Sequence, residues 1–152
     1  MNRALLALVL VPALAACGGV TAPPWSFSGT GAYQMRIMPS LGGSELFDTN
    51  LVDANGVLTG SLDLGMGNTI PITGSHSMVQ AFPVSTDLKA DITSASSTCL
   101  NNVSSRTLLS GQFTSANMFK GTASNYSCQD AGGGNPGILV LRDTGAVEMT
   151  RK

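Results

Sequence analysis

Apolar residues and glycines occupy every second position from residue 25 to residue 37, and mostly polar residues lie between them. The alternating set is Trp25, Phe27, Gly29, Gly31, Tyr33, Met35 and Ile37. A period of two is typical of a strand with one face in a protein core and the other in water. The pattern therefore predicts a strand over 25–37, and the glycines near its middle predict a bend or a bulge there.

Further short segments have the composition of strands and are separated by turn residues. Between two of them, Asp53-Ala54-Asn55-Gly56 contains an Asn-Gly pair that readily adopts the positive φ angles of a tight hairpin turn. No helical period longer than two turns occurs after the N-terminal segment. The strands predicted after residue 37 are 46–52, 57–64, 69–75, 77–84, 88–94, 107–114 and 118–124. A short apolar run follows at 138–142, and a frayed last strand is predicted at 147–150.

An apolar residue followed two positions later by glycine recurs in these segments, as in Leu58-Thr59-Gly60 and Phe119-Lys120-Gly121. Glycine within successive strands lets a sheet curve strongly without crowding of side chains on its inner wall. About eight short strands in hairpin succession, with nothing long enough for a crossover, are typical of antiparallel folds. We therefore expect an all-β domain, either a single antiparallel up-and-down barrel or a small sandwich.

An apolar run at residues 4–14 follows a single positive charge at Arg3. It is too short to span a bilayer, which needs about 20 apolar residues, but it suits the hydrophobic part of a secretory signal. Leu14-Ala15-Ala16-Cys17 ends this segment and resembles the lipobox of bacterial lipoproteins. The resemblance implies cleavage before Cys17, a diacylglyceryl group on its thiol, and acylation of the new amino terminus with a fatty acid such as palmitate. The alternative is an ordinary secretory signal cut near Ala16, with Cys17 an incidental thiol.

On the lipoprotein interpretation, the chain consists of a signal peptide at 1–16, a lipidated flexible tether at 17–24 and a β domain at 25–152. The tether contains two glycines and two prolines and has little to bury. Gly18 occupies the position where an aspartate commonly retains a lipoprotein at the inner membrane. By that resemblance we expect a protein of the cell envelope, held by lipid at the outer membrane rather than the inner one.

Cys99 and Cys128 are the two cysteines that remain when Cys17 carries lipid. An even pair in an oxidising compartment predicts a disulfide, and this one would close a loop of about 30 residues. The alternatives are two free buried thiols or a metal site. Two cysteines and one distant histidine make a poor zinc site, because a structural site needs four ligands.

Charged residues make up 11% of the chain, against about 25% in typical domains. Ser, Thr, Asn, Gln and Gly replace them, which favours a secreted β domain over a helical one. Lysine and arginine are scattered, so the basic face that a nucleic-acid partner requires is not visible in the sequence. We expect no nucleic-acid binding and a domain that folds without a cofactor.

His76 is the only histidine, and serines flank it on both sides. A serine and a histidine that are neighbours in a strand point to opposite faces and do not readily act together as nucleophile and base. The sequence also lacks a Gly-x-Ser-x-Gly motif. We therefore interpret His76 as an exposed histidine at the end of a strand and predict no catalytic residue.

Asp48, Asn50, Asp53 and Asn55 occur at alternate positions, which resembles the start of a calcium-binding loop. Gly56 falls one place late for such a loop, and the loop's twelfth position is not a glutamate. Turn chemistry explains the last two of these polar residues, and the first two fit the wet side of a strand. We therefore predict no metal site here.

Trp25-Ser26-Phe27-Ser28-Gly29 resembles the first strand of lipocalin-like barrels, which often begins with glycine-x-tryptophan; Pro23 stands in place of that glycine. The resemblance covers one strand and implies a barrel that carries a small apolar ligand. The side chains expected to line such a cavity are Met35, Met78, Phe82, Phe113 and Met118.

Because no motif specifies a reaction or a ligand, we expect a non-enzymatic binding or structural domain that meets an envelope protein partner. One alternative is the carrier of a small apolar ligand. The other is an inhibitor of an envelope enzyme such as a lysozyme or a protease, with the loop from Cys99 to Arg106 as its contact. A cavity of several hundred Å³ favours the carrier, and a solid barrel with a protruding rigid loop favours the inhibitor.

Overall fold

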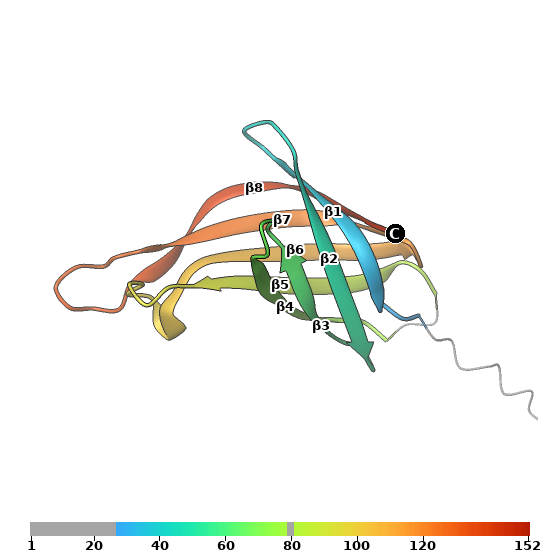
Figure 1. The fold of residues 1–152 in the computed structure, drawn as a ribbon, viewed down its shortest axis with the longest axis horizontal. Coiled ribbons are helices and arrows are strands. Elements are labelled where there is room, and N and C mark those ends of the chain that lie inside the picture. Colours follow the sequence, from blue (N-terminus) through green and yellow to red (C-terminus); the bar gives the residue numbers. More distant parts are fainter. Residues whose placement is uncertain (1–26, 79–80) are drawn as a thin grey trace, which may run out of the picture.

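The computed structural model describes residues 27–78 and 81–152, which form a closed antiparallel barrel of eight strands. Each strand pairs with the next along the chain, and the last pairs with the first (Figure 1). The fold is therefore the all-β barrel predicted above rather than the sandwich. The strands are β1 (Gly31–Pro39), β2 (Glu45–Ala54), β3 (Val57–Asp63), β4 (Thr69–His76), β5 (Val84–Thr93), β6 (Val103–Ser115), β7 (Met118–Gln129) and β8 (Ile138–Arg151), with a short 3-10 turn η1 (Leu100–Asn102) before β6.

Most predicted strands are confirmed within a few residues, but four of the predicted segments differ. The described part of the first predicted strand becomes regular only at Gly31. The strand predicted over 77–84 is wrong: in its described part only Val84 belongs to a strand. Pro83 has no N–H to donate to a ladder, which is consistent with the chain crossing between β4 and β5 there.

The two short segments predicted at 138–142 and 147–150 are one strand, β8, of 14 residues. The pairing of β7 with β8 shifts register between Asn125 and Tyr126. Such a bulge changes which side chains face inward, so the alternation in the sequence breaks although the strand continues.

Inward-facing side chains from all eight strands form the core inside the barrel. Tyr33, Phe113 and Phe119 are the largest that are fully buried. Glycines allow neighbouring backbones to approach closely: a Cβ added at Gly60 would lie 1.9 Å from the carbonyl oxygen of Asn50. A side chain at Gly60 would therefore collide with the backbone of β2, so the close approach of these two strands requires glycine.

The two ends of the barrel differ. At the end that we call the terminal end lie the start of β1, the end of β8 and the tight turns that join β2 to β3 and β6 to β7. At the opposite end, called the loop end, lie the longer connections 40–44, 64–68, 94–102 and 130–137. β6, β7 and β8 have 13, 12 and 14 residues, against 7 and 8 for β3 and β4. The long strands therefore extend past the short ones at the loop end (Figure 1).

One inward-facing polar group lacks a partner. Thr49, on β2, is 1% exposed, and its hydroxyl makes no hydrogen bond within the described ranges. A buried hydroxyl without a partner costs about 1–3 kcal/mol. The variant Thr49→Val keeps the shape and removes the hydroxyl, so we expect it to raise the free energy of unfolding by about 1 kcal/mol in a urea titration.

Thr86→Val is the matched control, because the Thr86 hydroxyl is equally buried but donates to the carbonyl oxygen of Val84 at 3.1 Å. That variant is expected to be neutral or less stable than the native protein. A loss of stability in Thr49→Val would instead show that the Thr49 hydroxyl has a favourable partner.

Candidate functional site

The terminal end of the barrel is closed by a cluster of aromatic rings. Phe27, in the segment before β1, lies with its ring centroid 4.8 Å from that of Phe113, 5.1 Å from His76 and 5.5 Å from Phe82. The Tyr33 hydroxyl donates to the carbonyl oxygen of Gly29 at 2.9 Å, which holds the same segment across the barrel. The segment that begins at Phe27 therefore covers this end.

A buried aspartate–histidine pair lies beneath the cluster. The Asp53 and His76 side chains are 5% and 1% exposed, and Nε2 of His76 lies 2.8 Å from Oδ2 of Asp53. Nδ1 of His76 faces the carbonyl oxygen of Ser77 at 3.0 Å. Each ring nitrogen of His76 therefore faces an oxygen acceptor, one on the Asp53 carboxylate and one on the backbone.

Two backbone N–H groups complete the surroundings of this carboxylate. Gly29 donates to Oδ2 of Asp53, and Gly56 donates to Oδ1, each at 2.9 Å. Burial alone would raise the pKa of Asp53, but the hydrogen bonds from Gly29, His76 and Gly56 together hold it below its ordinary value. Asp53 thereby joins the first segment of the domain to the β2–β3 turn and to β4.

The prediction that His76 is exposed is wrong. The residue is 8% exposed and faces inward, whereas Ser75 faces outward, as expected of neighbours in a strand. The sequence contained an indication of this. Ile70, Ile72 and Gly74 occupy alternate positions of the predicted strand and form its inward face, and His76 is the next position on that face. Its partner Asp53, 23 positions earlier, had been explained by turn chemistry alone.

The loop end holds a cavity of about 280 Å³ inside the barrel. Its deepest walls include Met35, Leu62 and Ile72, which are buried, whereas Leu64 and Ile92 at the rim are 43% and 39% exposed. The cavity is therefore closed below by the core and open to solvent above. The full lining is Met35, Ile37, Glu45, Phe47, Leu62, Leu64, Ile70, Ile72, Ala90, Ile92, Thr107, Leu109 and Asn125.

Three of these side chains are polar. Thr107 donates its hydroxyl to Oδ1 of Asn125 at 2.8 Å, and the amide nitrogen of Asn125 has no acceptor in the part of the chain that the structure describes. Glu45, at the start of β2, is the only charged residue of the lining. Such a cavity, apolar with a few polar groups, is typical of a small-molecule site.

Of the five side chains expected to line a cavity, only Met35 does so. Phe113 is fully buried in the aromatic cluster of the terminal end. Met78 and Phe82 are 73% and 38% exposed in the connection between β4 and β5, and Met118 is half-buried at the terminal end of β7. These four predictions are wrong, since composition identifies adaptable apolar side chains but not the end of the barrel at which they lie.

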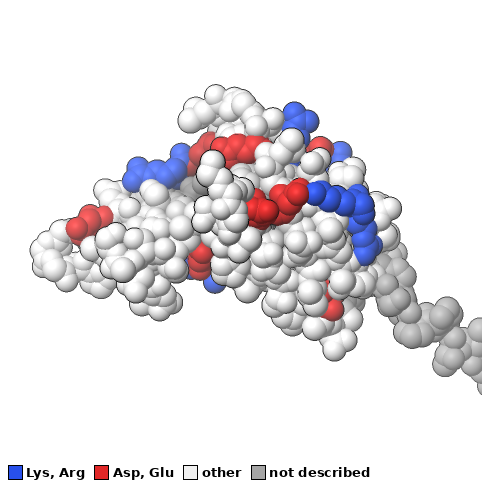
Figure 2. Space-filling view, in the orientation of Figure 1, with Lys and Arg blue, Asp and Glu red and all other residues white. Residues whose placement is uncertain are grey.

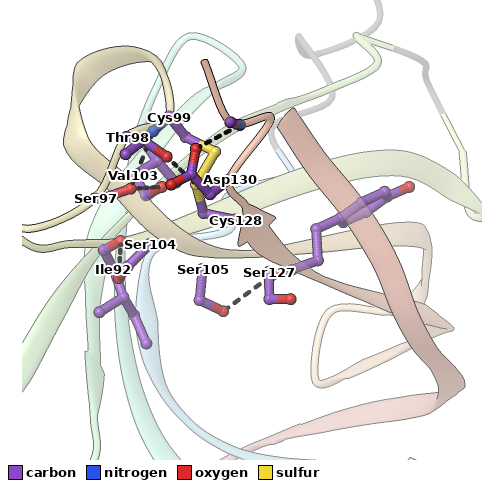
Figure 3. Close-up of a disulfide and its surroundings, with 12 residues drawn as sticks. Ile92, Ser97, Thr98, Cys99, Val103, Ser104, Ser105, Ser127, Cys128 and Asp130 are labelled. Atoms are coloured by element: carbon purple, nitrogen blue, oxygen red, sulfur yellow. Dashed lines mark hydrogen bonds between the residues drawn. A yellow bond between two sulfur atoms is a disulfide. The ribbon is translucent and has the colours of Figure 1, made fainter. Parts of the chain in front are cut away.

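The predicted disulfide between Cys99 and Cys128 is confirmed, with a sulfur–sulfur distance of 2.05 Å. It joins the loop before β6 to the loop-end part of β7 (Figure 3). The Ser97 hydroxyl donates to the carbonyl oxygen of Val103 at 2.7 Å and closes the same loop on itself. The loop beside the open end of the barrel is thus held in place from two sides.

The segment from Cys99 to Arg106 was considered above as an inhibitory contact. Between Cys99 and the start of β6 it contains one short turn, η1. Its last residues belong to β6, where the Arg106 guanidinium binds Asp91 at 2.6 Å. The hydrogen bond from Arg106 holds the pKa of Asp91 below its ordinary value. Arg106 is therefore engaged on the outer face of the barrel, next to Lys89.

Charge on the visible face of the molecule is sparse, and acidic side chains lie near basic ones (Figure 2). No three His, Cys, Asp or Glu residues within 27–78 and 81–152 are placed to hold a metal ion. Over the same residues, no helix is both long and apolar enough to cross a membrane. The predicted signal, the tether and Cys17 all lie outside the described residues.

The fold and the cavity define a class by structure alone: a closed, eight-stranded, antiparallel up-and-down barrel with one covered end and one open end. No protein-family model matches the sequence, and neither does any curated protein.

Proposed function

We propose that this protein is a lipid-anchored, non-enzymatic binding protein of the bacterial cell envelope, and that its barrel carries a small apolar ligand. The observation that supports the carrier over a purely structural domain or an enzyme inhibitor is the apolar cavity at the loop end. Small eight-stranded barrels are often filled by their own side chains. Here they leave a cavity of about 280 Å³ at the loop end.

The size of the cavity limits its ligand. At about 30 Å³ for each water-sized group, it accommodates about nine such groups. A ligand of about ten non-hydrogen atoms that gains about 0.6 kcal/mol per atom, within the range for small ligands, binds with a Kd in the tens of micromolar. The amide nitrogen of Asn125 offers a hydrogen bond to a polar atom on an otherwise apolar ligand.

The anchor and the cavity are compatible in space. Phe27 lies at the terminal end, and Cys17 precedes it by ten residues, so lipid on Cys17 holds that end nearer to the membrane. Attachment at the terminal end leaves the loop end, where the cavity opens, away from the point of attachment. We place the protein at the outer membrane, and the mass of the peptide that begins at Cys17, taken from the membrane fraction, tests the anchor.

Calorimetric titration with 1-octanol, which has nine non-hydrogen atoms, tests the binding function. We expect saturable binding at one site, with a Kd in the tens of micromolar and a negative heat-capacity change between two temperatures, because apolar surface is buried. Heats no larger than those of dilution, at protein concentrations well above this Kd, would contradict the proposal.

A further inference from the structure

Glu45 differs from the other acidic residues of the domain. Each of the other carboxylates in the described ranges has a hydrogen bond or an ion pair, such as Asp48 with Lys152 at 2.6 Å and Glu148 with Lys120 at 3.1 Å. Glu45 has neither within those ranges. It is also the single charged side chain that lines the cavity.

Glu45 lies at the rim of the cavity, at the loop end of the barrel. It pairs with Ile37 across β1 and β2 at the loop end, and both residues line the cavity. Beneath them the wall is apolar, and no lysine or arginine contributes to it. A ligand that fills the cavity with its apolar part therefore places its outer end near a carboxylate that no cation of the described chain neutralises.

We propose that the preferred ligand is a cationic amphiphile, an apolar body of about eight carbons that ends in a protonated amine. Its hydrocarbon part occupies the cavity, and its ammonium group pairs with Glu45 at the rim. This inference rests on the proposed function, since it needs the cavity to bind a ligand at all, and it adds the sign of the ligand's charge. An anionic amphiphile such as a fatty acid is disfavoured at the same rim, because two like charges repel there.

Three ligands of matched size separate the charge from the apolar contribution: octylammonium, 1-octanol and octanoate at pH 7. Glu45 is exposed, so the interaction is partly screened by water, and we expect octylammonium to bind about five- to tenfold more tightly than octanol. We expect octanoate to bind more weakly than octanol. The preference should shrink as salt is raised from about 0.01 M to about 1 M, because the Debye length falls from about 30 Å to about 3 Å.

The variant Glu45→Gln removes the charge and keeps the shape, and it should abolish the difference between octylammonium and octanol. Glu148→Gln is the matched control, since Glu148 lies on the outer face beside Lys120, and it should leave the difference unchanged. If octanol binds but octylammonium binds no more tightly, or if Glu45→Gln keeps the preference, the charge inference is overturned and the cavity function stands. If none of the three binds, both proposals fail.

Discussion

Replacing Asp53 with alanine is expected to lower the free energy of unfolding by about 3–5 kcal/mol, because it leaves Nε2 of the buried His76 and two backbone N–H groups without their carboxylate partner. Domains of this kind have a total stability of about 5–15 kcal/mol. The variant should therefore unfold at a much lower urea concentration than the native protein. Hydrogen exchange should also accelerate at the amides of Gly29 and Gly56, which donate to this carboxylate.

Asp48→Ala on the same strand is the matched control. Asp48 is 54% exposed and pairs with Lys152 at the surface, where such a pair is worth about 0–1 kcal/mol. If the two alanine variants lose similar amounts of stability, the buried pair does not hold the terminal end together.

The same carboxylate should make the protein sensitive to acid. The pKa of Asp53 is lowered in the folded state, so the unfolded chain binds a proton at higher pH than the folded chain does. The contribution of the Asp53 carboxylate to stability is therefore complete above the ordinary pKa of about 3.9. It is lost as the pH falls through the lower pKa of the folded state. Asp53→Ala lacks this contribution at every pH, so its stability should fall less steeply below about pH 4.

Removing the disulfide with the double variant Cys99→Ser and Cys128→Ser is expected to cost about 3–4 kcal/mol, on the chain-entropy estimate for a loop of this length. The loss arises mainly because the unfolded chain regains freedom over the 29 positions that separate the cysteines. Denaturant titration of the native protein and the double variant, each with and without reductant, measures it.

Reductant provides the control for that experiment. It should shift the unfolding midpoint of the native protein towards that of the double variant and leave the double variant unchanged. Equal stability of the two oxidised proteins would show that the bond adds nothing to the fold. An unequal response of the double variant to reductant would indicate an effect outside this disulfide.

Much of the barrel was predictable because half-buried strands record their two faces in the sequence. The Asn55-Gly56 turn indicated the β2–β3 hairpin, and both residues have the positive φ values that this turn requires. The disulfide followed from the count of cysteines and the expected compartment. What the pattern did not contain was the choice between a barrel and a sandwich, since the pairing of β1 with β8 joins residues more than 100 positions apart.

The candidate site was less predictable for a related reason. The alternation of residues along a strand identifies those that face inward, but it does not show at which end of the barrel each one lies. That depends on strand lengths, on the bulge near Asn125, and on the way the segment from Phe27 covers one end. His76 shows the same limit: its inward parity was visible, but its pairing with Asp53 depends on the registers of two successive hairpins.

On our proposal, the cavity at the loop end is the binding site. Ala90 on β5 is 3% exposed and lines this cavity, so Ala90→Leu fills part of it. Ala146 on β8 is exposed, and Ala146→Leu adds the same atoms outside the barrel.

The most direct measurement is a calorimetric titration of 1-octanol into the native protein and these two variants, with their folding checked by circular dichroism. We expect binding at least tenfold weaker in folded Ala90→Leu and unchanged in Ala146→Leu. Native affinity in a folded Ala90→Leu protein would contradict it.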